Sequence, residues 1–377
     1  MAGIYIHIPF CKQACHYCDF HFSTNRAIEP EMIAAIEKEF DLRKDYLGNE
    51  PIQTIYLGGG TPSILSDISL NRIFQKIYAG FEIKPAVEIT LEANPDDLTI
   101  EKLSFLKSLG VNRLSIGIQT FDDALLRYLN RAHTGTQAVA SVEKARAAGY
   151  SNISIDLIYA IPGQSVANWI TDIERALNLQ PEHISAYCLT LEEKTAFGRW
   201  QKSGKLIPIP DEQAAEYLYV LIDKLDSSGY EQYEISNFAK PGFRSRHNSS
   251  YWKQEKYLGI GPGAHSYNGT SRQANLSNNY RYVKTIMAGE LPAQTEYLTR
   301  EEKINEFILT SLRTSWGLNA LKLKEDFEFD LLHKYEALLN NLTANGFVEL
   351  NNGVITLTRS GKLVADKIAS DLFEVQT

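Results

Sequence analysis

Three of the four cysteines in this chain lie within one short segment, at Cys11, Cys15 and Cys18. Their spacing is C-x3-C-x2-C, and it directly follows an alternating apolar run that predicts a first β-strand over residues 3–8. Thiolates are soft ligands that suit zinc and iron–sulfur clusters. A four-iron cubane held by three thiolates leaves one iron open, and a small molecule with an amine and a carboxylate can chelate that iron.

A zinc site is the alternative use of these thiols. Structural zinc normally has four protein ligands, so such a site would take His7, His16 or His21 as its fourth ligand. A disulfide fits less well, because clustered cysteines in a long chain without a secretory signal favour a reducing compartment. The fourth cysteine, Cys188, lies in a predicted apolar strand, and we expect it to be a small buried hydrophobe outside the cluster.

The composition sets limits on the class of protein. The net charge is −8, from 38 basic and 46 acidic residues, and this acidic balance does not suggest a dedicated nucleic-acid binder. No uninterrupted apolar stretch is long enough to span a bilayer, and the first ten residues lack the basic start of a signal peptide. We therefore expect a cytoplasmic protein that binds no nucleic acid and has no stable membrane insertion.

Strand-like and helix-like segments alternate along the first half of the chain. Apolar residues at three- and four-residue spacing predict helices around residues 33–40, 70–77, 103–109 and 170–177. Six strands are predicted beside them, over residues 3–8, 53–57, 87–91, 113–118, 153–158 and 183–189. Repeated strand–helix units predict an α/β fold with a parallel sheet, either open or closed into a barrel.

The residues that could do chemistry come directly after these strands. The cysteines follow the first strand, residues 58–62 the second, 92–95 the third, 119–121 the fourth and 160–164 the fifth. In a β/α barrel all of these strand ends lie on one face, which is where sites are built. The sequence therefore predicts a single composite site.

Six motifs occur together between residue 4 and about residue 270: YIHIPFCxxxCxYCxF, GGGTPS, EANP, RLSIGIQTF, the Arg131–His133 pair and DLIYAIPGQ. In combination they resemble the radical S-adenosylmethionine (SAM) superfamily and, within it, the oxygen-independent coproporphyrinogen III oxidase group. The resemblance implies a partial (β/α)6 TIM-like barrel with a 4Fe–4S cluster on Cys11, Cys15 and Cys18. It also implies that SAM is bound by Tyr5, Tyr17, Gly59, Gly60, Thr61, Glu92, Gln119, Arg131 and Asp156.

These assignments have structural alternatives. A glycine triplet usually marks a turn, although here it lets the backbone approach a ligand closely. Glu92 ends an apolar strand and needs a partner, because an unpaired buried carboxylate is costly. That partner is either SAM or a salt bridge to Arg113 or Arg131.

Two departures from the oxidase pattern argue against porphyrinogen chemistry. Phe20 stands where the oxidases have a fourth cysteine, and we expect the N-terminal extension of the oxidases to be missing, because Tyr5 is nearly the first residue. A third feature, the segment HNxxYW at residues 247–252, resembles the signature of the haem chaperone branch of this group. The resemblance implies a haem site at His247, Asn248, Tyr251 and Trp252, with aromatic rings for stacking and a histidine for iron. The alternative is that His247 only bonds a neighbouring loop and Trp252 fills core.

The resemblance thus implies a chaperone that binds haem as cargo and transfers it to haem-accepting proteins, membrane haemoproteins among them. A haem donor protein is a further expected partner. The alternative function is oxygen-independent coproporphyrinogen III dehydrogenase, an oxidative decarboxylation, and another radical SAM reaction on an unnamed substrate is a third reading. Whether the chain is an enzyme is left open.

We expect three segments along the chain. Residues 1–230 form the barrel, and residues 231–300 form an extension with the HNxxYW motif. Residues 301–377 form a small α+β domain with a helix near 304–312, a second helix over 331–342, a hairpin around the turn at 351–353 and a last helix from about Ser360. This order resembles a winged helix, and its acidic character favours packing or partner contact over DNA binding.

Overall fold

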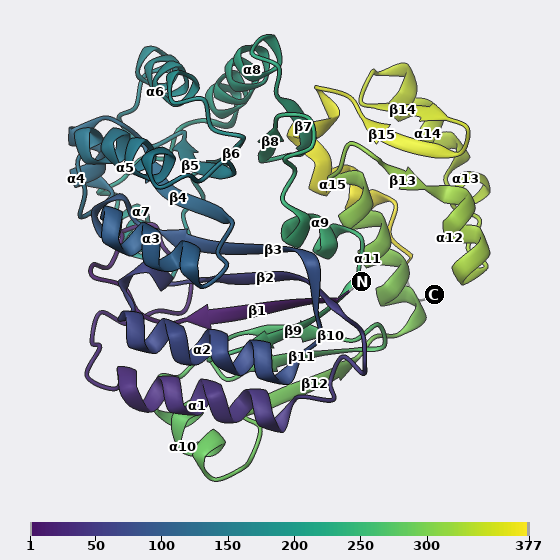
Figure 1. The fold of residues 1–377 in the computed structure, drawn as a ribbon. Coiled ribbons are helices and arrows are strands. Elements are labelled where there is room, and N and C mark those ends of the chain that lie inside the picture. The colour runs from purple at the N-terminus through teal and green to yellow at the C-terminus, as the bar shows by residue number, and fades with distance from the viewer. Residues whose placement is uncertain (1, 375–377) are drawn as a thin grey trace.

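The computed structural model describes residues 2–374, and most of them build around one large mixed sheet (Figure 1). Six parallel strands form its centre in chain order: β1 (Ala2–Ile8), β2 (Ile52–Gly59), β3 (Ile83–Ala93), β4 (Arg113–Gln119), β5 (Ile153–Tyr159) and β6 (His183–Cys188). The predicted parallel sheet of strand–helix units is therefore confirmed, and it is open rather than closed.

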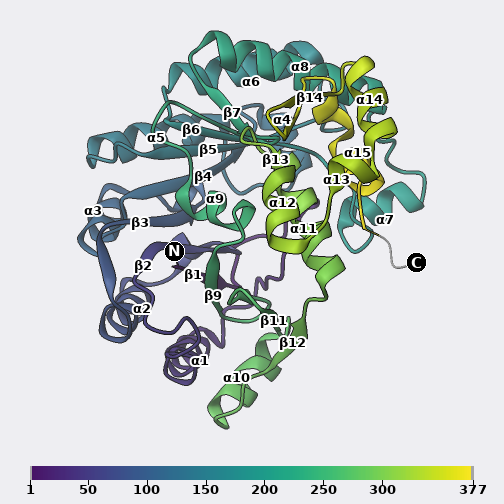
Figure 2. The same cartoon turned by 90° about the vertical axis from the view of Figure 1, so that its right-hand side faces the viewer.

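Helices cover the outer face of this curved sheet (Figures 1 and 2). They are α1 (Glu29–Leu42), α2 (Asp67–Gly80), α3 (Ile100–Ser108), α5 (Gly135–Ala147), α6 (Val166–Asn178) and α8 (Asp211–Ser227), with the shorter α4 (Asp123–Tyr128) and α7 (Ala196–Lys202) in the connections. Each predicted helix lies within or overlaps one of them.

The central strands alternate between two environments. In β1, Ile4, Ile6 and Ile8 are fully buried in the core against the helices, whereas Tyr5 and His7 lie on the other face. Burying each isoleucine contributes roughly 1.5–3 kcal/mol. The same alternation in the other central strands puts polar side chains on the inner face, where the site is built.

Residues 231–300 lengthen the same sheet at both edges. At one edge, β8 (Asn237–Ala239) pairs antiparallel with β6, and β7 (Glu231–Glu234) follows it. At the other edge, β9 (Lys256–Ile260) pairs parallel with β1, and β10 (His265–Tyr267), β11 (Ser271–Asn275) and β12 (Ala293–Tyr297) continue the sheet. Helices α9 (Arg246–Trp252) and α10 (Asn279–Met287) lie between these strands in sequence.

The C-terminal segment has its own apolar core. It contains α11 (Arg300–Leu312), β13 (Leu318–Asn319), α12 (Ala320–Phe327), α13 (Leu331–Lys334), α14 (Glu336–Ala344), β14 (Val348–Asn351), β15 (Val354–Leu357) and α15 (Ala365–Asp371). The predicted hairpin is confirmed, and β13 adds a third strand to it. The single helix predicted over residues 331–342 was wrong, because Tyr335 separates two helices there. The winged-helix likeness stays a prediction.

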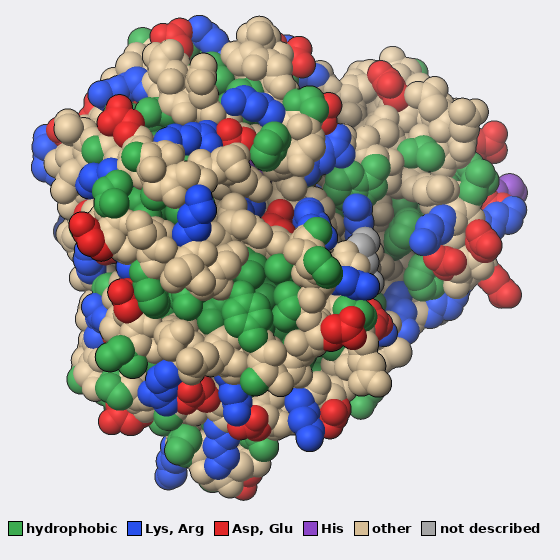
Figure 3. Space-filling view, in the orientation of Figure 1, with side chains coloured by type: hydrophobic (Ala, Val, Ile, Leu, Met, Phe, Trp, Pro, Cys, Tyr) green, Lys and Arg blue, Asp and Glu red, His purple; other side chains and the backbone are tan. Residues whose placement is uncertain are grey.

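This C-terminal domain lies beside the sheet, opposite the end toward which the β1 arrow points (Figure 1). Arg313 bridges to Glu234 of β7 at 3.3 Å, and Arg359 forms an ion pair with Asp223 of α8. On the face shown in Figure 3, both signs of charge are interspersed around a hydrophobic patch near the centre. Within residues 2–374, every helix is too short or too polar to cross a bilayer.

One buried carboxylate holds the strands of the extension to α1. Glu39 is completely buried and accepts hydrogen bonds from the Gly261 N–H at 2.8 Å, the Asn275 amide at 2.7 Å and the Tyr282 hydroxyl at 2.6 Å. The Arg43 guanidinium lies 3.3 Å from the same carboxylate. Four groups therefore satisfy a charge that would otherwise be costly to bury.

We expect Glu39→Ala to destabilise the protein by about 3–5 kcal/mol, because it leaves Arg43 buried without its anionic partner. The matched control is Glu31→Ala on the exposed side of the same helix, which should change stability by less than about 0.5 kcal/mol. The measurement is urea denaturation of both full-length variants. Equal losses for the two variants would contradict this account of the network.

Candidate functional site

A cavity of about 450 Å³ lies at the carboxyl ends of the central strands. Cys11, Cys15 and Cys18 line it. Eight of the nine residues expected to bind SAM also line it: Tyr17, Gly59, Gly60, Thr61, Glu92, Gln119, Arg131 and Asp156. The ninth, Tyr5, instead lines a second cavity. The sequence therefore predicted which residues converge, with Tyr5 as the exception.

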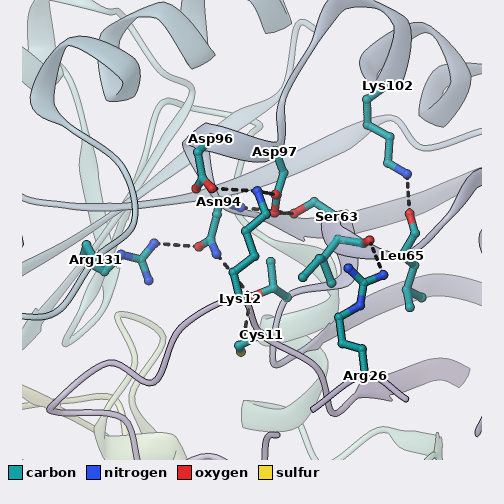
Figure 4. A network of polar contacts seen from close by, with 12 residues as sticks. Cys11, Lys12, Arg26, Ser63, Leu65, Asn94, Asp96, Asp97, Lys102 and Arg131 are labelled. Atoms are coloured by element: carbon teal, nitrogen blue, oxygen red, sulfur yellow. Dashed lines mark hydrogen bonds and ion pairs between the residues drawn. The ribbon is translucent and has the colours of Figure 1, made fainter. Parts of the chain in front are cut away.

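The loop that carries the cysteines is held by the segments after β2, β3 and β4 (Figure 4). The Thr61 hydroxyl lies 3.4 Å from the Cys11 sulfur, and a guanidinium nitrogen of Arg131 lies 3.5 Å from the Cys15 sulfur. Lys12 forms an ion pair with Asp96 at 2.7 Å. Because separate strand ends hold separate parts of the loop, the thiol positions depend on the whole sheet.

The thiols fit a cluster better than a single ion. Within the described residues, no group of three or more histidine, cysteine or carboxylate side chains is placed to hold one metal ion. The three thiols instead share a cavity, as expected when each binds a different iron of a cubane. The histidines of the zinc alternative are already bonded: His7 and His16 to the carbonyl oxygens of His21 and Tyr128, and His21 to the side chain of Asn279.

Burial raises the pKa of the Cys11 thiol to about 11 and that of Cys18 to about 12. The Arg131 guanidinium opposes this effect by favouring both thiolates. Thiols with such values keep their protons at neutral pH, so binding of a metal cluster must displace them.

The glycine segment after β2 has to lack side chains. Gly59 adopts a φ of +101°, and a Cβ there would collide with the His7 ring. A Cβ on Gly60 would lie 2.6 Å from the Ile8 carbonyl oxygen. The bare backbone thus packs β2 against the end of β1 and leaves the Gly59 N–H free to donate to Glu92 at 3.1 Å.

Glu92 is a carboxylate that faces the cavity without an ionic partner. Its second oxygen accepts from the Tyr56 hydroxyl at 2.7 Å, and neither Arg113 nor Arg131 forms an ion pair with it in the described structure. Burial and the nearby Asp156 raise its pKa to about 7 despite these hydrogen bonds. Burial also raises the pKa of Asp156, which accepts from the Ser115 hydroxyl. Two desolvated carboxyl groups on one cavity favour a cationic ligand.

Arg131 connects the cysteine loop to the strand ends (Figure 4). One of its terminal nitrogens donates to the Asn94 side chain and to the Gly117 carbonyl, both at 2.6 Å. Its Nε–H is buried without a partner in the described structure, so it can still donate to a ligand carboxylate. Gln119 beside it has a φ of 69°, a strained conformation of the kind that concentrates at functional sites.

The HNxxYW segment lies in α9, and its side chains line two different cavities. Asn248 lines the first cavity, whereas Tyr251 and Trp252 line the second, which has a volume of about 500 Å³. His247 lies between them and is 1% exposed. Asp19 and Phe20 line both cavities, so the two spaces share a wall.

Both ring nitrogens of His247 are occupied. Its Nδ1 lies 2.8 Å from the Thr54 hydroxyl and its Nε2 lies 2.8 Å from the Tyr251 hydroxyl. Burial lowers the pKa of His247 to about 3, so its imidazole is neutral. In this arrangement His247 holds Tyr251 in place, and its expected contact with haem stays a prediction.

Sequence reasoning missed several residues that line the first cavity: Tyr56, Ser115, Ser185 and Tyr187. Period-two alternation is the signal that could have found most of them, because it puts Tyr56, Ser115 and Ser185 on the inner face with Glu92 and Asp156.

Cys188 was expected to be buried, which was wrong. It is the last residue of β6, where it is exposed and lines the same cavity.

Comparison with known proteins adds to this geometry. Residues 5–176 match the family model described as the radical SAM superfamily, and residues 298–364 match the HemN C-terminal domain. The chain is 38% identical to the heme chaperone HemW of Bacillus subtilis, over 98% of each chain. It is 39% identical to the heme chaperone HemW of Lactococcus lactis, over 92% of this chain and 89% of that one.

A solved structure shares the fold. Coproporphyrinogen III oxidase (HemN) from Escherichia coli superposes with a TM-score of 0.86 over 99% of this chain and 90% of that one, at 24% sequence identity. This likeness confirms the α/β fold that the strand–helix pattern predicted.

The raised pKa of Glu92 predicts a pH-dependent loss of stability. Between pH 4.5, its usual pKa, and about pH 7 the folded state holds a proton that the unfolded state has lost, so stability falls as pH rises through this range. We expect Glu92→Gln to reduce this decrease in the free energy of unfolding by up to about 3 kcal/mol, because the amide does not titrate. Urea denaturation at pH 5 and pH 8 measures it, with the exposed Glu290→Gln as control. Parallel pH curves for the wild type and Glu92→Gln would contradict the assignment.

Proposed function

The chain belongs to the heme chaperone HemW family, and from this premise we propose that it binds haem and transfers it to acceptor haemoproteins. The proposal rests mainly on one observation: residues of α9 line two different cavities, and these cavities share a wall. One cavity offers thiols and buried carboxyl groups, and the other offers aromatic rings. This arrangement supports a cofactor site beside a separate site for cargo.

In this proposal the first cavity holds a 4Fe–4S cluster on Cys11, Cys15 and Cys18, and SAM on the eight residues named for it above. When bound, the cluster supplies one-electron chemistry to SAM. Glu92 and Asp156 face the positive charges of the ligand, and the free Nε–H of Arg131 faces its carboxylate. Tyr5 acts indirectly, since its ring packs at 6.1 Å from Tyr56, which lines this cavity.

The cargo site takes Tyr251 and Trp252 as contacts, whereas His247 and Asn248 fix the helix that presents them. The partners are proteins that accept haem, and we extend the proposal to membrane haemoproteins and to a haem donor protein. Oxidation of coproporphyrinogen III is not favoured, because the position of the oxidases' fourth cysteine is held by Phe20. That side chain is 71% exposed between the cavities.

We expect haem titration of the full-length protein to produce a Soret band and Trp252→Ala to weaken the affinity about two- to thirteenfold. The expected size follows from the loss of one aromatic stacking contact, worth about 0.5–1.5 kcal/mol. Trp316→Ala, a tryptophan outside both cavities, is the control and should leave the affinity unchanged. A wild-type protein whose spectrum does not change at micromolar haem would overturn the proposed function.

We also expect the cluster to act in haem transfer rather than in haem capture. Cys11→Ser should remove the visible absorbance of a cluster reconstituted with iron and sulfide, leave haem affinity unchanged, and block transfer to an apo-haemoprotein. The measurement follows the Soret spectrum of the acceptor under anaerobic conditions. Transfer at the wild-type rate by a variant without a cluster would contradict this role.

A further inference from the structure

We propose that haem sits in the second cavity with His265 as the ligand of its iron. This inference rests on the proposed haem-binding function. It adds which cavity binds the haem and which residue ligates the iron. It moves iron ligation away from the HNxxYW segment and assigns it to the first residue of β10, directly after the glycine-rich connection from β9.

The second cavity suits a flat, largely apolar ring with acidic substituents. Its volume of about 500 Å³ lies within the range of small-molecule sites, roughly 300–1,000 Å³. The aromatic side chains that line it are Tyr5, Phe20, Tyr251, Trp252, Tyr257 and Tyr267. Arg272 also lines it, half-exposed and ion-paired with Glu306. It supplies a cation that a haem carboxylate can approach.

The first cavity is a poorer place for haem. Glu92 and Asp156 face it as desolvated carboxyl groups, and both would oppose the acidic substituents of a porphyrin. The same pair favours a cationic ligand. The second cavity also carries carboxylates, from Asp19, Glu255 and Glu306, so its aromatic lining and its histidines, rather than its charge, favour it for haem.

Three histidines line the second cavity, and their hydrogen bonds distinguish them. Both ring nitrogens of His7 are engaged, with the Tyr5 hydroxyl at 3.2 Å and the His21 carbonyl at 2.7 Å. His21 uses its Nε2 on the Asn279 side chain at 2.7 Å. His265 is exposed, and within residues 2–374 neither of its ring nitrogens takes part in a hydrogen bond. A neutral imidazole with a free nitrogen is a common ligand of haem iron.

The backbone holds His265 firmly at this position. Gly259 lies so close to the His265 carbonyl that any Cβ there would collide with it. The Ser266 hydroxyl oxygen accepts the Gly259 N–H at 2.9 Å, which fixes the start of β10 against β9. A Cβ on Gly261, which has a φ of +103°, would collide with the His7 carbonyl. Glycines in this connection therefore bring His265 to the cavity wall, and they do not merely form a turn.

The test compares His265→Ala with the wild type in the full-length protein. Two probes are used, haem and metal-free protoporphyrin IX, which has the same ring without iron. We expect His265→Ala to shift the Soret band and to weaken haem binding about tenfold or more, since even outer-shell changes at metal sites cost 10–100-fold. Binding of metal-free protoporphyrin should change less than about twofold, and added imidazole should restore the haem spectrum. The exposed His333→Ala in the C-terminal domain is the matched control.

A second measurement tests the location. Haem in the second cavity leaves the first one free, so SAM affinity of the reconstituted protein should be the same with and without haem to within a few-fold. Strict competition between SAM and haem would place the haem in the first cavity and overturn the proposal.

The outcomes separate this inference from the function on which it rests. If wild type and His265→Ala bind haem with the same spectrum and affinity, the protein still binds haem and the ligand assignment is wrong. If His265→Ala loses both probes equally, His265 shapes the cavity and does not ligate iron, which also overturns the assignment. If the wild type binds neither probe, the proposed function itself fails.

Discussion

The two-residue alternation of the central strands is the constraint on which the site depends. Side chains such as Ile6 and Leu57 face the helices and supply the apolar burial that holds the sheet together. Their neighbours must then point to the inner face, where Tyr56, Glu92 and Asp156 are removed from most of the water. Burial there raises the pKa of both carboxyl groups. The packing that stabilises the fold therefore also creates the electrostatic conditions of the cavity.

Helix α9 supplies hydrogen-bond partners for polar side chains on the inner face of the sheet. An open sheet with polar residues inside needs a partner that satisfies them, and α9 provides one. Its first N–H groups, from Arg246 and His247, donate to the Glu88 carboxylate at 3.1 and 3.0 Å. The His247 ring then bonds Thr54 and packs 5.0 Å from the Tyr56 ring. One helix thus fills the interior and keeps two cavities apart.

His247 is best understood through this position. It bonds Tyr251 on the side of the second cavity and stacks on Tyr56, which donates to Glu92 on the side of the first. A change in either cavity has a short path of direct contacts to the other. Both ring nitrogens of the motif histidine are therefore hydrogen-bonded to neighbouring side chains, to Thr54 and Tyr251.

The sequence predicted the helices and central strands well, because each of them has its own local spacing of apolar residues. It also predicted that residues after separate strands converge, since strand ends of a parallel sheet share one side, and eight of the nine residues expected to bind SAM do line one cavity. Tyr5 is the exception: it lines the second cavity together with Tyr257 of β9, the strand that pairs with the other edge of β1. Pairings such as β9 with β1 were beyond prediction, since no local pattern links residues about 250 positions apart. The bonds that occupy His247 are hidden from the sequence for the same reason.

The second cavity is assembled from parts that are distant in the chain. Phe20 comes from the cysteine loop, Trp252 and His265 come from the extension, and Glu306 and Thr310 come from α11 of the C-terminal domain. No one of the three predicted segments contains this cavity alone. Because Asp19 and Phe20 directly follow the last cluster cysteine, any shift of the cysteine loop changes the walls of both cavities together. Coupling between cofactor and cargo then needs no long-range pathway, since a single two-residue wall connects them.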